Sequence, residues 1–149
     1  METWEIEARL SIQQTIARYT HAGDSGRSKD FAEAFTVDGV MEPYPDAPIA
    51  GREAIVAFLE EQKASLAGAM DSRLIRHFVS SLRIDFPSRH EATTSSYFMA
   101  VTQIGPDHWG RYRDRFVPVD GEWLIAHRFV RVDGAVPGAW QPEPGGSAG

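Results

Sequence analysis

Two side chains that lie far apart in the sequence, Asp24 and His77, could act together as a proton acceptor and its orienting carboxylate. A neutral imidazole accepts a proton near pH 7, and a carboxylate bonded to its other nitrogen fixes the tautomer and stabilises the imidazolium that forms. Because Ile75, His77 and Val79 alternate along a predicted strand, we expect His77 on an apolar face. The alternative is a purely structural hydrogen bond between a buried histidine and a buried aspartate.

Tyr19 and Arg128 are candidates for stabilising negative charge on a reacting molecule. Tyr19 shares a helical stripe with two isoleucines, so its ring should be buried while its hydroxyl needs a partner. Arg128 alternates with apolar residues along a predicted strand, and a guanidinium on such a face needs an anionic partner or a polar ligand. The structural alternatives are a core tyrosine and an ion pair of Arg128 with Asp114 or Asp24.

Tyr112 and Asp114 share one face of a predicted strand, because side chains alternate with a period of two. The neighbouring arginines at 111, 113 and 115 would line an apolar pocket poorly, so we expect them to face solvent or another subunit. Tyr112 and Asp114 are therefore candidate substrate-binding residues, although Asp114 could instead serve as the ion-pair partner of Arg128. The apolar residues expected in the pocket wall are Met41, Phe58 and Phe78.

Metal and thiol chemistry find no support in the sequence. The chain has no cysteine, which excludes disulfides, thiolate metal sites and a cysteine nucleophile. The remaining histidines show no paired metal-ligand spacing, and structural or surface roles are expected for His21, His90, His108 and His127. We therefore predict no metal site.

Helical and β patterns occupy different parts of the chain. The expected helices are residues 4–23, 28–35 and 55–66, with a short strand over 37–44. Gly23 and Gly68 are the expected helix stops and Ser28 a helix cap, which places Asp24 just past the end of the first helix. The expected later strands are 73–86, 91–104, 109–119 and 122–133. Residues 87–90, 105–107 and 120–121 resemble turns, so the order predicts an α+β fold with an antiparallel-rich sheet covered by helices.

Size and charge narrow the class of protein. The 149 residues fit one domain over 1–134, followed by a Pro- and Gly-rich tail over 135–149 that Trp140 could hold in place. A formal charge of -6 argues against a nucleic-acid surface. The acidic N-terminus lacks a signal-peptide core, and no apolar run is long enough to cross a bilayer, so we expect no membrane contact and a cytoplasmic location.

Several short motifs follow one another in a characteristic order. They are Ile12-Gln13, Ala17-Arg18-Tyr19, Asp24, Phe35, Asp38-Gly39-Val40, Gly51-Arg52-Glu53-Ala54-Ile55, Arg76-His77-Phe78-Val79, residues 110–116 and residues 120–128. Together they span residues 10–132 and resemble the SnoaL-like family of the nuclear transport factor 2-like superfamily. The resemblance implies a cone-shaped α+β barrel, in which helices close a curved sheet around an apolar pocket.

Within that superfamily the sequence is most similar to hexachlorocyclohexane dehydrochlorinase, scytalone dehydratase and bile-acid 7α-dehydratase, which perform eliminations with a His-Asp pair. Asp24 and His77 match that pair, and the dehydrochlorinase also has an arginine at the position of Arg128. Its pocket lysine is replaced by Tyr19 here, which favours the dehydratases because they use pocket tyrosines. The resemblance thus implies a cofactor-free dehydratase for a hydrophobic small molecule, polycyclic compounds included.

Other functions of the same fold stay open at this point. An isomerase or cyclase, like ketosteroid isomerase and the polyketide cyclases, would use the same pair without loss of mass. An epoxide hydrolase like the limonene enzyme would need an Asp-Arg-Asp group, which Asp24, Arg128 and Asp114 could imitate. A non-catalytic binding module would show a filled pocket or a separated pair. Homodimers or homotrimers that meet through the exposed sheet face are also expected.

Overall fold

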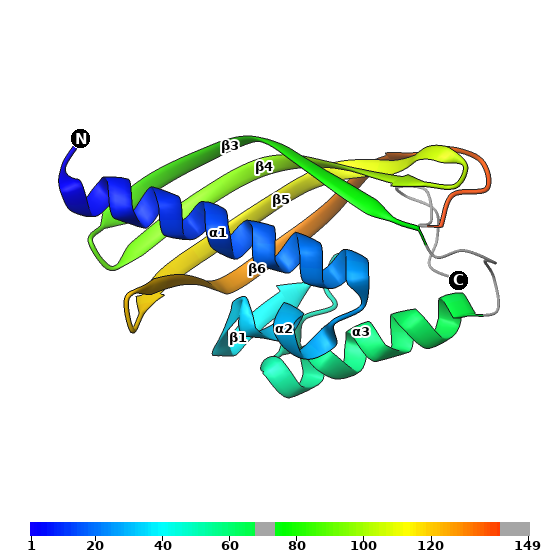
Figure 1. Cartoon of the computed structure of the whole chain (residues 1–149), viewed down its shortest axis with the longest axis horizontal. Coiled ribbons are helices and arrows are strands. Elements are labelled where there is room, and N and C mark those ends of the chain that lie inside the picture. The colour runs from blue at the N-terminus through cyan, green and yellow to red at the C-terminus, as the bar shows by residue number, and fades with distance from the viewer. Residues whose placement is uncertain (68–73, 141–149) are drawn as a thin grey trace.

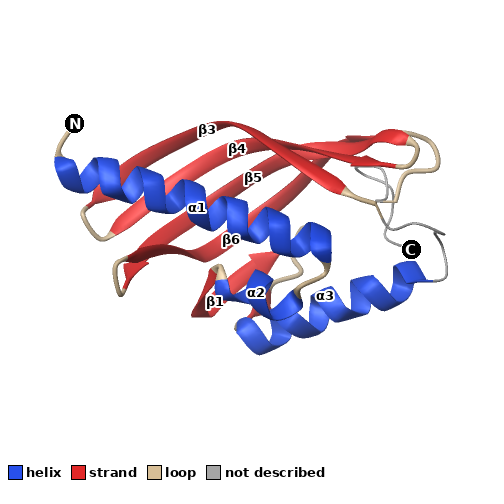
Figure 2. Cartoon of the chain, in the orientation of Figure 1, coloured by secondary structure: helices blue, strands red, loops and turns tan. Residues whose placement is uncertain are grey.

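Helices and one curved sheet form the α+β cone that the sequence predicts, in a computed structural model that describes residues 1–67 and 74–140 (Figures 1 and 2). The elements are α1 (Thr3–Ser25), α2 (Ser28–Glu33), β1 (Phe35–Glu42), β2 (Ile49–Ala50), α3 (Arg52–Ala67), β3 (Arg76–Ser88), β4 (Glu91–Thr102), β5 (Gly105–Val119) and β6 (Glu122–Ala135). The six strands follow the order β2-β1-β6-β5-β4-β3, and only β1 and β6 pair in parallel. Figure 1 shows α1 across the face of the four long strands, with α2 and α3 beside β1.

The end of α1 differs from the prediction in a way that matters for Asp24. The helix passes through Gly23 and ends at Gly26, which has a left-handed φ of 70° and donates its N–H to the Gly23 carbonyl. Gly23 stays helical and leaves room for the ring of Phe31, because a Cβ at Gly23 would come within 3.2 Å of that ring. Asp24 therefore lies in the last turn of α1 rather than after it, so the rigid helix sets the direction of its side chain.

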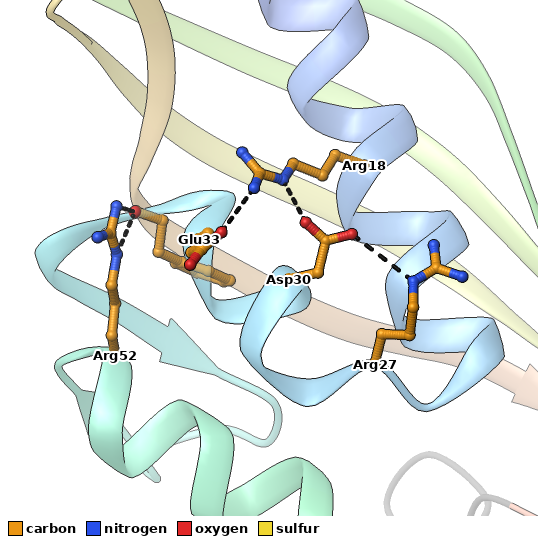
Figure 3. A network of polar contacts seen from close by, with 6 residues as sticks. Arg18, Arg27, Asp30, Glu33 and Arg52 are labelled. Carbon is orange, nitrogen blue, oxygen red and sulfur yellow. Dashed lines mark hydrogen bonds and ion pairs between the residues drawn. The ribbon is translucent and has the colours of Figure 1, made fainter.

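A polar network holds the corner between α1 and α2 (Figure 3). Arg18 of α1 binds Asp30 through Nε and Glu33 through Nη2, each at 2.7 Å. Arg52 of α3 donates to the Phe35 carbonyl from Nε at 3.0 Å and from Nη2 at 2.8 Å. Exposed ion pairs are weak one by one, but here Arg18 joins α1 to α2 while Arg52 joins α3 to the start of β1.

The predicted cap of the second helix is wrong. The N-cap residue of α2 is Arg27, without a side-chain cap, and Ser28 instead donates from Oγ to Oε1 of Glu60 at 2.6 Å. Lys63 adds a bond from Nζ to the Gly26 carbonyl at 2.9 Å. These contacts tie α3 to the α1–α2 corner. The expected stop at Gly68 lies outside the described residues.

Each expected strand is present, but several boundaries differ from the prediction. Pro87 and Ser88, predicted in a turn, belong to β3, and Phe35, predicted at the end of the second helix, begins β1. Residues 105–107, predicted as a turn, belong to β5, and the turn lies at residues 103–104. The Asp120-Gly121 turn is confirmed, with both residues at positive φ, 49° and 84°. The two-residue strand β2 was not expected. No helix in the described part of the chain is long and apolar enough to cross a membrane.

The core lies between α1 and the concave face of the sheet. Thr15 of α1 donates from Oγ1 to the Trp123 carbonyl at 2.5 Å, and Ser11 Oγ accepts the Trp123 N–H at 2.8 Å. These bonds fix α1 against the start of β6. Tyr112 and Asp114 of β5 are buried, whereas the alternating Arg113 and Arg115 are exposed, as the period of two predicts.

Candidate active site

Asp24 and His77 meet at the open end of the cone. Oδ1 of Asp24 lies 2.6 Å from Nδ1 of His77, and Oδ2 accepts the backbone N–H of His77 at 2.9 Å. A carboxylate can only accept hydrogen bonds, so Nδ1 of a neutral His77 carries the proton and Nε2 is left as the proton acceptor. The contact joins the last turn of α1 to the start of β3, which the sequence pattern alone could not establish.

A second His-Asp pair lies beside the first. Nδ1 of His108 lies 2.7 Å from Oδ2 of Asp107, and the rings of His108 and His77 are 6.1 Å apart between centroids. Consecutive strand residues normally point to opposite faces, but the β4–β5 register shifts between Ala100–His108 and Val101–Pro106. Asp107 is the extra residue of this bulge, and so both Asp107 and His108 are buried.

Asp24, His77 and His108 line one cavity of about 140 Å³, whereas Asp107 bonds to His108 without lining it. Its size is close to that of an apolar cavity of about 150 Å³ that accepts benzene, so the cavity fits a ring compound. Its polar and titratable lining residues are Tyr19, Thr20, Asp24, Tyr44, Gln62, His77, His108 and Tyr112. The rest of the wall is formed by Gly23, Phe31, Met41, Pro43, Phe58, Leu59, Ile75, Phe98, Val130, Val132 and Trp140.

Two tyrosines give the cavity neutral hydrogen-bond donors. Burial raises the pKa of the Tyr19 hydroxyl and raises that of Tyr112 well above its ordinary value. Both phenols therefore stay protonated through the neutral range. The two rings lie edge to face with centroids 5.9 Å apart, and Phe98 stacks on Tyr112 at 4.6 Å.

Arg128 and Asp114 form a buried ion pair behind these tyrosines. Arg128 donates from Nε and Nη2 to the two oxygens of Asp114, each at 2.8 Å, and both side chains are fully buried. The guanidinium carbon lies 4.2 Å from the ring centroid of Tyr19 and 3.9 Å from that of Tyr112. Although burial opposes the charged form, Asp114 raises the pKa of Arg128 above its ordinary value. Arg128 thus supports the tyrosine rings.

The predicted site residues divide into two groups. Those that line the cavity are Asp24, His77, Tyr19, Tyr112, Phe58 and Met41. Arg128 and Asp114 do not line it: they pair with each other inside the core, where Nη1 of Arg128 has no hydrogen-bond partner among the described residues. Phe78 also lies away from the cavity: it follows His77 on β3, points to the opposite face and is exposed. Asp24 binds His77 instead of Arg128, so the Asp-Arg-Asp group of an epoxide hydrolase is not formed.

His108 and Asp107 were not predicted as site residues, and Trp140 was predicted only to hold the tail and not to line the cavity. Alternation back from Tyr112 would have brought His108 to the inner face, but the predicted strand began only at residue 109. The pairing of Asp107 with its neighbour depends on the bulge, which has no clear sequence signal. The expectation that Trp140 holds the start of the tail is supported: its backbone N–H donates to both carboxylate oxygens of Asp107, at 3.1 and 3.0 Å.

The surroundings of His108 favour the neutral form of its imidazole. Burial lowers the pKa of His108, the hydrogen bond that its Nδ1–H donates to Asp107 opposes this, and His77 lowers the pKa further. His108 is therefore neutral at neutral pH, with its Nδ1–H held by Asp107 and Nε2 as the free nitrogen. Within residues 1–67 and 74–140, no three histidine or carboxylate side chains gather in a way that could hold a metal ion.

Comparison with solved structures shows the same fold in other proteins. A candidate scytalone dehydratase from Novosphingobium aromaticivorans is 24% identical, with a TM-score of 0.79 and 100% coverage of both chains. Rv3472 from Mycobacterium tuberculosis, whose function is unknown, is 27% identical, with a TM-score of 0.72 and coverage of 89% of this chain and 76% of that one. A Catenulispora acidiphila protein in complex with S-DNPA is 31% identical, with a TM-score of 0.66 and coverage of 84% and 92%.

A comparison with curated proteins gave no match. Residues 4–129 match the SnoaL-like domain. The match begins in the first turn of α1 and ends within β6, so it includes every element between them. The N-terminal helices, the curved sheet and its cavity agree with that match. The chain therefore belongs to the SnoaL-like family of the nuclear transport factor 2-like superfamily.

Proposed function

We propose that the protein is a cofactor-free lyase that removes water from a small, apolar, hydroxylated carbonyl compound. The observation that carries the proposal is the contact of 2.6 Å between Asp24 and His77, at the wall of a mostly apolar cavity. Family membership supports the same class, since members with a His-Asp pair perform eliminations. A binding module without chemistry would not need two histidines, each bonded to an aspartate, in the wall of one cavity.

The geometry supports the following order of events. Nε2 of His77 takes a proton from the carbon next to the substrate carbonyl, and Asp24 stabilises the imidazolium. The electron pair of the broken C–H bond forms a carbon–carbon double bond as the C–O bond to the hydroxyl breaks. The departing hydroxide takes the proton from His77 and leaves as water. The hydroxyls of Tyr19 and Tyr112 donate to the carbonyl oxygen, where negative charge develops.

His108 has a complementary part in this reaction. It is neutral, and its free Nε2 can accept a hydrogen bond from the substrate hydroxyl. Its ring lies 6.1 Å from that of His77, which suits two neighbouring positions of one substrate. Together the two histidines hold the acidic hydrogen and the leaving group in place at the same time.

The test is incubation with a panel of hydroxylated cyclic ketones, followed by mass spectrometry of the products. Loss of one water with wild type is expected, and His77→Gln should lower kcat by about 10²–10⁴-fold, the usual contribution of a general base. His90→Gln is the matched control, because His90 is exposed in the β3–β4 turn. Equal turnover in wild type and His77→Gln would exclude this mechanism.

Isomerisation or cyclisation is the second candidate, and the paired histidines are the observation that favours it. One histidine could remove a proton and the other return it to a different carbon, with Asp24 and Asp107 holding the two rings. The product would then have the mass of the substrate. Exchange of substrate hydrogen with deuterium from the solvent, without loss of water, would identify this reaction.

We also propose that two or three copies associate through the outer face of the sheet. Phe78 pairs with Met99, which in turn pairs with Trp109, so exposed apolar side chains lie side by side on three strands, and Tyr97 extends the patch. Apolar surfaces of this kind mark sites of association. We propose that a second copy of this chain covers the patch, because homo-oligomers are common among proteins of this fold.

A further inference from the structure

Asp107 binds two parts of the protein that are otherwise separate. Oδ1 accepts from Thr102 Oγ1 at 3.0 Å, the Trp140 N–H lies 3.1 and 3.0 Å from the two oxygens, and Oδ2 lies 2.7 Å from His108 Nδ1. The carboxylate is almost fully buried, so these donors replace water completely. One carboxylate thus holds both the imidazole of His108 and the segment that follows β6.

The backbone of Asp107 strengthens its hold on that segment. Its carbonyl accepts the Val136 N–H at 3.0 Å, and Ala139 donates to the Val136 carbonyl at 3.0 Å. Residues 136–140 therefore form a turn that lies against the start of β5. The turn brings Trp140 to the wall of the cavity that His77 and His108 also line.

We propose that Asp107 is a positioning residue that couples docking of residues 136–140 over the cavity to the tautomer and orientation of His108. The coupling follows from shared atoms, because both oxygens that accept from Trp140 also serve Thr102 or His108. If the segment leaves, water reaches the carboxylate and competes for its bond to the imidazole. Linkage makes the effect reciprocal, so a ligand that holds His108 also favours the docked segment.

The catalytic consequence rests on the proposed function, but the coupling itself does not. In the docked state Trp140 completes the cavity wall and His108 presents Nε2 to the substrate. In the undocked state the cavity is open to water and the imidazole is free to turn. Full activity therefore requires the segment to be docked, and the substrate is enclosed at the same moment as His108 is fixed.

Two substitutions at Trp140 separate the backbone N–H from the indole. Trp140→Pro removes both, whereas Trp140→Ala removes only the ring and keeps the donor to Asp107. The measurement is NMR of protein carrying ¹⁵N-labelled histidine, with the His108 signals assigned through their loss in His108→Gln. We expect a slowly exchanging Nδ1–H signal for His108 in wild type and in Trp140→Ala, and its loss or fast exchange in Trp140→Pro.

A third variant checks the carboxylate directly. Asp107→Asn presents an amide N–H₂ to His108, so the neutral ring should change to the Nε2–H tautomer, and the pH dependence of its shifts should change with it. Unchanged signals of His127, which contacts Glu42 and does not line the cavity, would show that the fold is intact in every variant. Identical His108 signals in Trp140→Pro and Trp140→Ala would overturn the coupling. The measurement uses no substrate, so a failure to find dehydratase activity leaves this result unaffected.

Discussion

Asp24 holds His77 at two points, through the imidazole Nδ1 and through the backbone N–H. The carboxylate therefore fixes both the start of β3 and the direction of the ring. The two functions can be separated by substitution. An asparagine amide can still accept the backbone N–H of His77, but it cannot also accept the Nδ1–H of the ring.

Asp24→Asn should lose activity and keep most of its stability. The amide oxygen can still accept the His77 N–H, but its N–H₂ group faces Nδ1 and favours the tautomer in which Nε2 carries the proton. We expect kcat to fall by about 10²–10⁴-fold. Asp24→Ala should in addition lower the free energy of unfolding by about 1–3 kcal/mol, because it leaves a backbone donor without its partner. Chemical denaturation and steady-state kinetics check both results, and equal stability losses in the two variants would contradict the prediction.

The hydroxyls of Tyr19 and Tyr112 can be tested without disturbing the rings. Tyr19→Phe and Tyr112→Phe retain the aromatic contacts to Arg128, so both variants should fold. If a hydroxyl donates to the developing oxyanion, its removal should lower kcat by up to about 10²–10³-fold with a smaller effect on KM. A rise in KM with kcat unchanged would instead show that the hydroxyls only bind the substrate in its ground state.

Arg128 should matter for stability. Arg128→Met leaves the buried Asp114 carboxylate unpaired and should lower the free energy of unfolding by about 3–5 kcal/mol. The double variant Arg128→Met/Asp114→Leu should recover much of this loss, because no charge is then left unpaired. Arg113→Met, on the exposed face of β5, is the control. Urea denaturation of the four proteins makes the comparison, and a double variant no more stable than Arg128→Met would refute it.

His108 should make the protein sensitive to acid. Burial lowers its pKa in the folded state, whereas the unfolded chain has the ordinary value of about 6.5. As the pH falls below that ordinary value, the unfolded state binds a proton that the folded state does not, so the free energy of unfolding falls by at most about 1.4 kcal/mol per pH unit. His108→Gln should remove this part of the pH dependence and His90→Gln should not. Denaturation curves across the acidic range measure the free energy of unfolding at each pH. The same pH dependence in wild type and His108→Gln would contradict the prediction.

Association through the outer sheet face predicts a change of mass in solution. Tyr97→Lys places a charge within the exposed apolar patch and should convert the oligomer into monomers. Gln103→Lys adds the same charge in the exposed β4–β5 turn and should leave the mass unchanged. Light scattering after size exclusion measures both. A wild-type monomer, or an oligomer unaffected by Tyr97→Lys, would rule out this face.

Much of the frame could be predicted because the periodic patterns are local. Alternation along β5 correctly placed Tyr112 and Asp114 inside, and the same rule applied to β3 would have excluded Phe78, which must face away from its neighbour His77. Arg128 was harder, because alternation brings it inside without saying whether it meets a substrate or Asp114.

The start of β5 shows where local patterns fail. Gly105, Pro106 and Asp107 have the composition of a turn, and Ile104 in the real turn is apolar. Tertiary contacts reverse that preference, because Asp107 binds Trp140, which is distant in sequence. The second His-Asp pair was missed for this reason: its existence depends on a register shift that only the folded sheet defines.

The position of β6 has a consequence for biosynthesis. β6 lies between β5 and β1, so β1 cannot join the long strands of the sheet until residues 122–135 have been made. A nascent chain lacking β6 leaves the long hairpins with an unpaired edge and α1 without the bonds to Trp123. The cavity therefore forms only after residues 122–135 have joined the sheet, and until then the edge of β5 has no partner strand.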